Sequence, residues 1–217
     1  MSMSNDGSMI NRTFIKDEAY NILSNWIITG KLQPKSRIKI NELSESLGIS
    51  RTPVREAILK LEDEGLIISK ANRWTIVAPI DLMEAIDIYQ IVFTLESLAI
   101  KEGFKNMSNE DITELEEINE KTKAALSEKN LIDALISDND FHDKIVNLSA
   151  NKEIMPILKN LKRKIQRIEL FFFENLDNSL DSYCEHKAIV EAMKERDLDK
   201  TIEALKVNWS NTIRGVY

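Results

Sequence analysis

Apolar residues recur three and four positions apart along most of this chain of 217 residues, which is the spacing of one face of a helix. The first such stretch covers residues 14–29, and Gly30 follows where the end of a helix favours glycine. A second, shorter stretch stops at Gly48. A third begins near Ser50, which can cap a helix, and continues to about Gly65. The pattern therefore predicts three helices in the first third of the chain.

The spacing changes after the third predicted helix. The segments "LIIS" (66–69) and "WTIVAP" (74–79) read as short strands joined by "KANR", which predicts a β-hairpin. Three helices followed by a hairpin make a winged helix-turn-helix. We therefore expect this domain over residues 13–80, after a polar tail at residues 1–12.

Beyond residue 80 the chain reads as one helix after another. Because the connections are short, neighbouring helices are expected to pack antiparallel. We therefore expect residues 81–217 to form an all-α antiparallel bundle, which makes the whole chain mainly α. The spacing predicts helices over about 82–102, 109–127, 130–149, 153–174, 178–195 and 198–213, with caps at Ser108, Asn130 and Asp197.

Composition favours a cytoplasmic protein without a membrane segment. No apolar run approaches the roughly 18 residues that a membrane span needs. Cys184 is the single cysteine, so an intramolecular disulfide is excluded, which fits a reducing compartment. We expect Cys184 to be a buried thiol.

Charge is divided unevenly between the two predicted domains. The formal net charge of the chain is −7, yet its first 80 residues carry 11 basic and 9 acidic side chains. Residues 31–60 alone carry seven basic and three acidic ones. A basic patch on an acidic chain predicts that the first domain meets an anion and the second does not.

Two arginines stand four residues apart in "SRTPVREAI" (50–58), at the start of the third predicted helix. Arg51 and Arg55 then share one exposed face, while Val54 and Ile58 point inward. In a helix-turn-helix this helix enters the major groove, where a planar guanidinium can pair with guanine or hold a phosphate. The position predicts DNA recognition, and the alternative for such a pair is an ordinary solvated face.

The first domain resembles the DNA-binding domain of GntR-type bacterial transcription regulators, most specifically in "LGISRTPVREAILKLEDEGLI". The resemblance covers residues 14–80 and implies that the recognition helix and the hairpin both contact an operator. The residues that it assigns to this contact are Arg51, Thr52 and Arg55 on the helix, and Asn72 and Arg73 on the hairpin.

Two positions depart from the pattern of that family. Asn41 stands where the family usually has an arginine, so one DNA contact is altered. Trp74 stands where the family usually has a glycine, and a tryptophan cannot copy the tight turn that glycine allows. We expect Trp74 to anchor the core, with a widened wing as the alternative.

The second predicted domain contains both histidines of the chain. Asp138 and His142 stand four residues apart on one predicted helix, a spacing that lets both bind one ion, and His186 lies on a later helix. On the residues alone, a carboxylate–histidine pair at this spacing is more often an ordinary surface interaction.

This half of the chain resembles the all-helical ligand-binding domain, called FCD, of the FadR subfamily of GntR regulators. The resemblance rests on "DNDFHDKIVNLSANKEI" and "EHKAIVEAMKERDLDKTIEAL". It implies one divalent metal ion, Zn²⁺, Ni²⁺ or Mn²⁺, held by Asp138, His142 and His186. The last histidine of the family falls on Asn208, whose amide oxygen is a weaker ligand.

The same resemblance implies a small-molecule effector. Many relatives carry an arginine on the first bundle helix that pairs with an effector carboxylate, and here Val92 stands in its place. The basic run "KRKIQR" (162–167) reads as a solvated face, and the alternative is that Arg163 or Arg167 turns inward to meet an anionic effector. Asn208 belongs to the same expected pocket. A carboxylate bound through the metal is the favoured effector, and a metal-free cavity for a larger apolar ligand is the alternative.

These features predict a homodimeric DNA-binding regulator, most often a repressor in this family, that a small molecule controls. A metal-dependent hydrolase and a helical interaction module are the alternatives from other classes. The hydrolase lacks an obvious general acid–base residue beyond the metal ligands, and we do not expect an enzyme.

Overall fold

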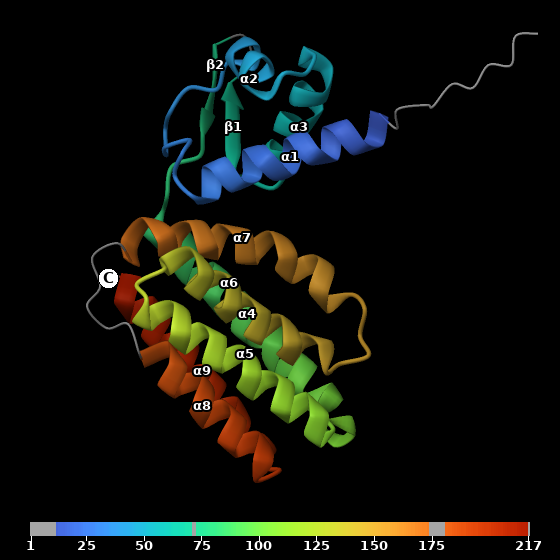
Figure 1. The fold of residues 1–217 in the computed structure, drawn as a ribbon, viewed down its shortest axis with the longest axis vertical. Helices are drawn as coiled ribbons and strands as arrows, with labels where there is room; N and C mark the ends of the chain where they lie inside the picture. Colours follow the sequence, from blue (N-terminus) through green and yellow to red (C-terminus); the bar gives the residue numbers. More distant parts are fainter. Residues whose placement is uncertain (1–11, 71–72, 174–180, 217) are drawn as a thin grey trace, which may run out of the picture. The chain divides into compact units, whose positions relative to one another are not determined.

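The chain divides into two compact units, one up to Ile80 and one from Asp81 onward. The computed structural model describes residues 12–70, 73–173 and 181–216. Figure 1 shows helices in both units and a hairpin in the first. The predicted fold class, a winged helix-turn-helix followed by an all-α bundle, is confirmed.

The first unit has the three helices and the hairpin that the apolar spacing predicts. Its elements are α1 (Arg12–Ile28), α2 (Ile40–Leu47), α3 (Arg51–Asp63), β1 (Ile67–Lys70) and the antiparallel β2 (Trp74–Val77). Gly48 ends α2 at a φ of 65°, a conformation that a residue with a side chain rarely adopts. This turn allows α3 to begin three residues later, with Ser50 as its N-cap residue.

A single hydrophobic core fixes the orientation of α3. Leu23 from α1, Val54 and Leu61 from α3, and Val77 from β2 are all buried in it. Because Val54 and Leu61 face this core, the opposite face of α3 lies in solvent.

Trp74 does not belong to that core. Its side chain is 37 % exposed, so the expectation that it anchors the core is wrong. The hairpin register explains the difference, because Trp74 pairs with Lys70 at the turn end of the strands, whereas Val77 pairs with Ile67 at the buried end.

The helical unit has six α-helices and one short 3₁₀ turn among the residues that the structure describes. They are α4 (Leu82–Gly103), the 3₁₀ turn η1 (Phe104–Asn106), α5 (Asn109–Ser127), α6 (Leu131–Asn147), α7 (Ile154–Phe173), α8 (Asp181–Lys194) and α9 (Leu198–Val216). The predicted caps are confirmed: the side chains of Ser108, Asn130 and Asp197 each accept a hydrogen bond from a backbone N–H three residues later.

Helix α4 packs against α6, α7 and α9 and carries an unusual buried residue. Its inward face includes Tyr89, Val92 and the carboxylate of Glu96, which is 0 % exposed. At the end of α4, a Cβ added to Gly103 would lie 2.2 Å from the carbonyl oxygen of Leu148. The glycine therefore permits a close approach between α4 and the residue that follows α6.

Cys184 lies on α8 and is exposed, so the expectation of a buried thiol is wrong. His186 on the same helix is 0 % exposed. Successive residues of a helix are about 100° apart, so a residue two positions from the inward-facing His186 points away from the bundle interior.

Candidate nucleic-acid interface and metal centre

The start of α3 presents polar side chains to solvent. Arg51, Thr52 and Arg55 are exposed, while Val54 and Ile58 are buried in the core of the first unit. The separation of faces predicted from the apolar spacing is therefore present in the structure.

A groove in the first unit joins residues that are distant in the sequence. Asn41 from the beginning of α2 lines it together with Arg51 and Arg55 from α3. The rest of its polar wall is Thr75 and the ion pair of Lys39 with Glu42, whose Nζ and Oε1 atoms lie 2.7 Å apart. Arg73 is exposed beside the hairpin, whereas Asn72 lies outside the described residues. Guanidinium, ammonium and amide donors thus converge on one concave surface, which suits the phosphates and base edges of DNA.

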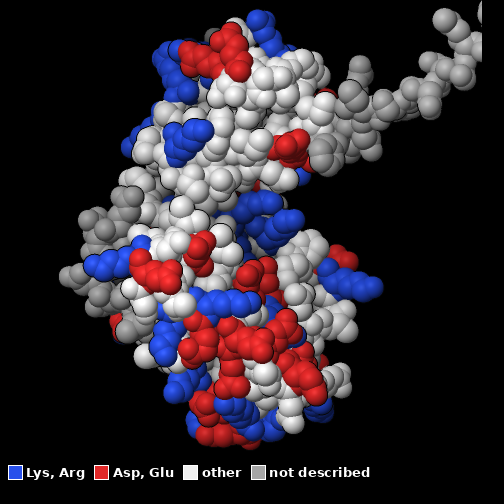
Figure 2. Space-filling model, in the orientation of Figure 1, with Lys and Arg blue, Asp and Glu red and all other residues white. Residues whose placement is uncertain are grey.

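The charge difference between the units follows the same division. On the face that Figure 2 shows, acidic side chains gather more densely over the helical unit than over the first unit. A polyanion is therefore attracted to the first unit rather than to the bundle.

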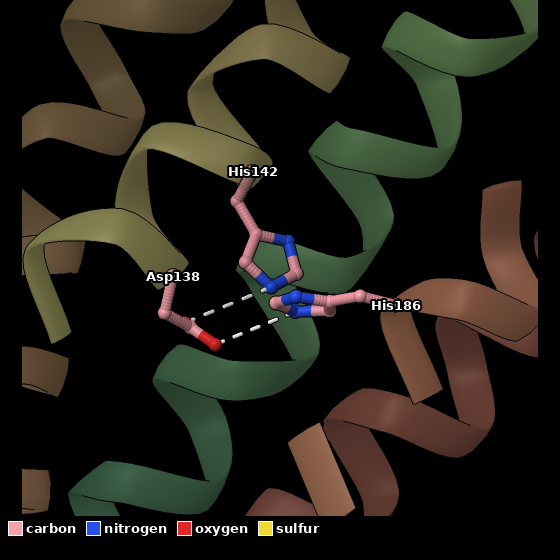
Figure 3. A group of neighbouring side chains, drawn as sticks. All are labelled: Asp138, His142 and His186. Atoms are coloured by element: carbon pink, nitrogen blue, oxygen red, sulfur yellow. Dashed lines mark ion pairs between the residues drawn. The ribbon is translucent and has the colours of Figure 1, made fainter. Parts of the chain in front are cut away.

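The helical unit brings Asp138, His142 and His186 together. Figure 3 shows the carboxylate of Asp138 facing both imidazole rings, with Asp138 and His142 on α6 and His186 on α8. The Nε2 atom of His142 lies 3.9 Å from Asp138 Oδ2, and that of His186 lies 3.4 Å from Asp138 Oδ1. One ligand atom from each residue falls within 4.8 Å of the others, a spacing that fits coordination of one ion.

Glu96 holds the ring of His142 in the orientation that a metal ligand needs. Its Oε2 atom lies 2.9 Å from His142 Nδ1 and also accepts a 2.9 Å hydrogen bond from Trp209 Nε1. Lys162 Nζ lies 3.2 Å from the other oxygen. Because an ionised carboxylate only accepts, His142 donates from Nδ1, and Nε2 is the ring atom that faces Asp138 and would bind a metal.

The carboxylate of Glu96 is ionised in spite of its burial. Burial alone raises the pKa of Glu96, but the charges of His142 and Lys162 and the hydrogen bonds from His142 and Trp209 outweigh that effect and lower the pKa from 4.5 to about 2. At neutral pH, Glu96 therefore accepts hydrogen bonds from His142 and Trp209 and forms an ion pair with Lys162.

Asn119 orients the ring of His186, as Glu96 orients the ring of His142. Its Oδ1 atom lies 3.2 Å from His186 Nδ1, and its Nδ2 donates to the backbone carbonyl of Tyr183 at 3.1 Å, which fixes the orientation of the amide. Phe141 stacks on the imidazole at a centroid distance of 3.9 Å. Burial lowers the pKa of His186 to about 4, so this ring is neutral at pH 7.

A buried nitrogen without a hydrogen-bond partner tests whether Asp138, His142 and His186 suit a metal ion. His186 Nε2 is buried and has no hydrogen-bond partner in the structure, although it faces Asp138. A buried, neutral imidazole nitrogen with an unused lone pair is what a divalent cation coordinates. The donor set of two imidazoles and one carboxylate suits Zn²⁺, Ni²⁺ or Mn²⁺ and leaves further coordination positions open.

A cavity of about 140 Å³ adjoins this centre. Its polar lining includes Asp138 and His142 from the metal centre, together with Glu169 from α7 and Asn208 from α9. Burial, and secondly the charge of Asp138, raise the pKa of Glu169 well above its usual range. The apolar and hydroxyl-bearing remainder of the wall is Thr122, Leu126, Leu131, Ala134, Leu135, Leu170, Ser182, Trp209 and Thr212.

Two families match this chain. The domain described as "Bacterial regulatory proteins, gntR family" matches residues 15–77, and the FCD domain matches residues 87–209, which is more than half of the chain. The chain belongs to the GntR family of transcriptional regulators and carries an FCD domain. The resemblance drawn from its motifs is thereby confirmed.

Relatives of this GntR regulator match over most of their length. The Bacillus subtilis HTH-type transcriptional regulator YdhC is 27 % identical over 179 residues, covering 82 % of this chain and 80 % of the relative. The Escherichia coli HTH-type transcriptional repressor RspR is 24 % identical over 191 residues, covering 88 % and 84 %. The structure of E. coli McbR/YncC has the same fold, with a TM-score of 0.82, 22 % identity and coverage of 94 % and 97 %. These relatives are named as regulators of transcription.

The structure unites the three expected ligands of the GntR regulator but only one of its expected pocket residues. Asn208 lines the cavity, whereas Val92, Arg163 and Arg167 are not among its lining residues in the described chain. Val92 is 0 % exposed in the packing of α4, and Arg167 is buried in an environment that includes the charge of Glu84.

Sequence reasoning did not find Glu96, Asn119 and Glu169. A signal existed for Glu96, because it is the one charged residue within the apolar run "IVFTLESLAI". Glu169 gives a similar signal, because it is the one charged residue within "IELFFF" (168–173), whereas Asn119 stands on a helix with many charged side chains, where nothing local distinguishes it. No helix of the described chain combines the length and apolarity that crossing a bilayer requires.

Proposed function

We propose that this GntR regulator represses transcription by binding a two-fold symmetric operator as a homodimer, under the control of a small molecule held at a divalent-metal site. The observation that carries the proposal is the joint presence of an exposed arginine pair on α3 and of a three-ligand centre in the helical unit. The name of one relative, the repressor RspR, supports the direction of control.

On the DNA side, the N-terminal turns of α3 enter the major groove. Arg51 and Arg55 reach base edges or phosphates, and Thr52 contacts the backbone. Asn41 shares the groove of these arginines, and Arg73 is exposed beside the hairpin, so both extend the contact along the duplex. In a homodimer, two such surfaces read half-sites about 34 Å apart or a multiple of it.

The homodimer is supported by an apolar stripe on α4. Ile91 is 46 % exposed and Leu98 is 40 % exposed, and they stand seven residues apart on one face of the helix. Large apolar side chains at this spacing match the seam between paired helices. A second copy that covers this face removes both from water.

On the effector side, Asp138, His142 and His186 would hold the metal. When bound, it supplies a Lewis-acidic position for a carboxylate of the effector or for water. Glu96 and Asn119 keep both histidines in the donor tautomer. The ligand controls DNA binding only if it binds the operator-competent arrangement and the alternative one with different affinities.

Two measurements test this function. Binding to the DNA upstream of the gene is measured by fluorescence anisotropy for Arg51→Ala and Arg55→Ala, with Arg214→Ala as a control on an exposed position of α9. Each recognition-helix variant is expected to bind about tenfold or more weakly, because one base contact contributes about 1–3 kcal/mol. Unchanged affinity in folded variants would reject the DNA-binding role of these arginines.

The metal is tested by elemental analysis of untagged protein beside His142→Ala. We expect close to one metal ion per chain in the parent and its loss in the variant. A parent that takes up no metal after exposure to Zn²⁺, Ni²⁺ or Mn²⁺ would leave the regulator without its metal centre. The larger, metal-free ligand cavity would then be the better description.

A further inference from the structure

The cavity beside the candidate metal centre is lined by carboxyl groups without a basic side chain among the described residues. Among the described residues that line it there is no lysine or arginine, while Asp138 and Glu169 both contribute carboxyl groups. Ser182 Oγ already donates to Asp138 at 2.8 Å. A carboxylate has two oxygens that each accept more than one hydrogen bond, so a ligand in the cavity meets acceptors that can take further donors.

Glu169 is the first of these acceptors. Its side chain is buried, with 4 % exposure, and it receives a long hydrogen bond of 3.4 Å from Tyr89 Oη. No basic residue of the described chain forms an ion pair with it. A negative charge on a carboxyl group that is buried without a cation costs free energy, and a cationic group of a ligand offsets that cost.

Asn208 is the second. Its Nδ2 donates to Glu185 Oε2 at 2.9 Å, which turns the amide so that Oδ1 is left over. This oxygen is buried and has no hydrogen-bond partner, and the residue is 2 % exposed. Glu185 is itself held by Asn211 Nδ2 at 2.6 Å, so the orientation of the amide is set by the protein. Asn208 lines the cavity, and a donor on a ligand can satisfy this buried acceptor.

We propose that this cavity selects effectors that carry a primary amine, whose N–H groups Glu169 and Asn208 accept, on a small apolar body with an anionic group at the metal end. An ammonium has three donors, so one group can serve both acceptors, and its bond to a carboxylate is charge-assisted. The leucine side chains of the wall contact the body. A 150 Å³ apolar cavity in another protein holds benzene, which sets the size at about that of one ring.

The amine preference rests on the proposed effector site and adds a positively charged group to the effector that this site recognises. The position that resemblance gives to a metal-binding histidine holds Asn208, an acceptor for the ligand. Where the resemblance places an arginine that pairs with an effector carboxylate, this chain has Val92, and the proposed pair is reversed, with the carboxylate on the protein and the cation on the ligand.

The test compares matched probes that differ only in the amine. The pairs are 4-(aminomethyl)benzoate with 4-methylbenzoate and 5-aminopentanoate with pentanoate, and binding to the full chain is measured by calorimetry with and without Zn²⁺. The variants are Glu169→Gln, which removes the charge, and Asn208→Leu, which removes the acceptor. Glu117→Gln, at an exposed position of α5, is the matched control.

In the parent, the amine-bearing member of at least one pair is expected to bind about tenfold or more tightly. Glu169→Gln and Asn208→Leu are each expected to reduce that ratio to about threefold or less, and Glu117→Gln to leave it unchanged. If one of these two cavity variants does not fold, the ratio measured on the other tests the proposal. Equal or tighter binding of the amine-free probes, a full preference in both variants, or no binding of any probe would overturn the proposal.

Metal content and operator affinity are measured on the same preparations. A parent without metal or without operator binding counts against the proposed function alone, because the ratio between matched probes is obtained in either form. A regulator with metal and operator binding but without the amine preference counts against this inference alone.

Discussion

The substitution Glu96→Gln probes how the protein orients His142, a ligand of the proposed metal site. In the parent, one oxygen of Glu96 accepts from His142 Nδ1 and Trp209 Nε1, and Lys162 Nζ lies 3.2 Å from the other. The amide of glutamine has one oxygen and one NH₂ group. Whichever way it turns, the NH₂ group faces a donor, either at the histidine–tryptophan end or at Lys162.

The structure allows the size of two separate effects to be worked out. Losing a buried charged partner costs several kcal/mol, but Lys162 keeps a second carboxylate, Asp143, at 2.7 Å. We therefore expect the free energy of unfolding to fall by about 2–3 kcal/mol, which lowers the Tm by roughly 5–10 °C for a protein of this size. Because the His142 ring loses its orienting acceptor, the affinity for Zn²⁺ is expected to fall about 10- to 100-fold.

The assay is competition for Zn²⁺ against a chromophoric chelator at a temperature well below the Tm of every variant. Asp143→Asn is the matched control, because it removes charge from Lys162 without touching His142, and its affinity for Zn²⁺ should stay within about threefold of the parent. A folded Glu96→Gln protein that binds Zn²⁺ as tightly as the parent would refute the argument that Glu96 selects the donor tautomer of His142.

Two further predictions concern the helical unit. Gly103→Ala should lower the free energy of unfolding by about 1–3 kcal/mol in chemical denaturation, because the new Cβ would lie 2.2 Å from the Leu148 carbonyl oxygen. An unchanged denaturation midpoint would mean that α4 and the end of α6 separate easily. A hydrogen bond from Lys144 lowers the pKa of Asp111 from 3.8 to about 2. The ionised Asp111 therefore stabilises the fold above pH 3.8, by about 1 kcal/mol after allowance for solvent screening. This contribution is lost as the pH falls toward 2. Asp111→Asn should therefore be less stable than the parent at pH 7 and flatten its loss of stability over that pH window, and a parallel pH profile would contradict this.

Features that depend on neighbouring residues were predictable from the sequence. The caps at Ser108, Asn130 and Asp197 each join groups only three residues apart, so the residue types and their spacing are sufficient to place them. The same holds for the exposed face of α3, because the helical period puts Arg51 and Arg55 opposite the buried residues of that helix.

Part of the metal centre was also within reach. The four-residue spacing on α6 places Asp138 and His142 on one helical face, whatever packs against it. Spacing alone cannot bring in His186, which lies 44 residues beyond His142 in the sequence, and resemblance to a family supplied it.

Only the tertiary structure decided what surrounds these ligands. Glu96 and His142 are 46 residues apart, and Asn119 and His186 are 67 apart, so their hydrogen bonds exist only once α4, α5, α6 and α8 have packed. Packing also decided that Glu169 rather than an arginine of α7 lines the cavity. The rotation of a helix about its axis is set by all the side chains that it buries, whereas its existence, its caps and its polar face are set by residues within one or two turns.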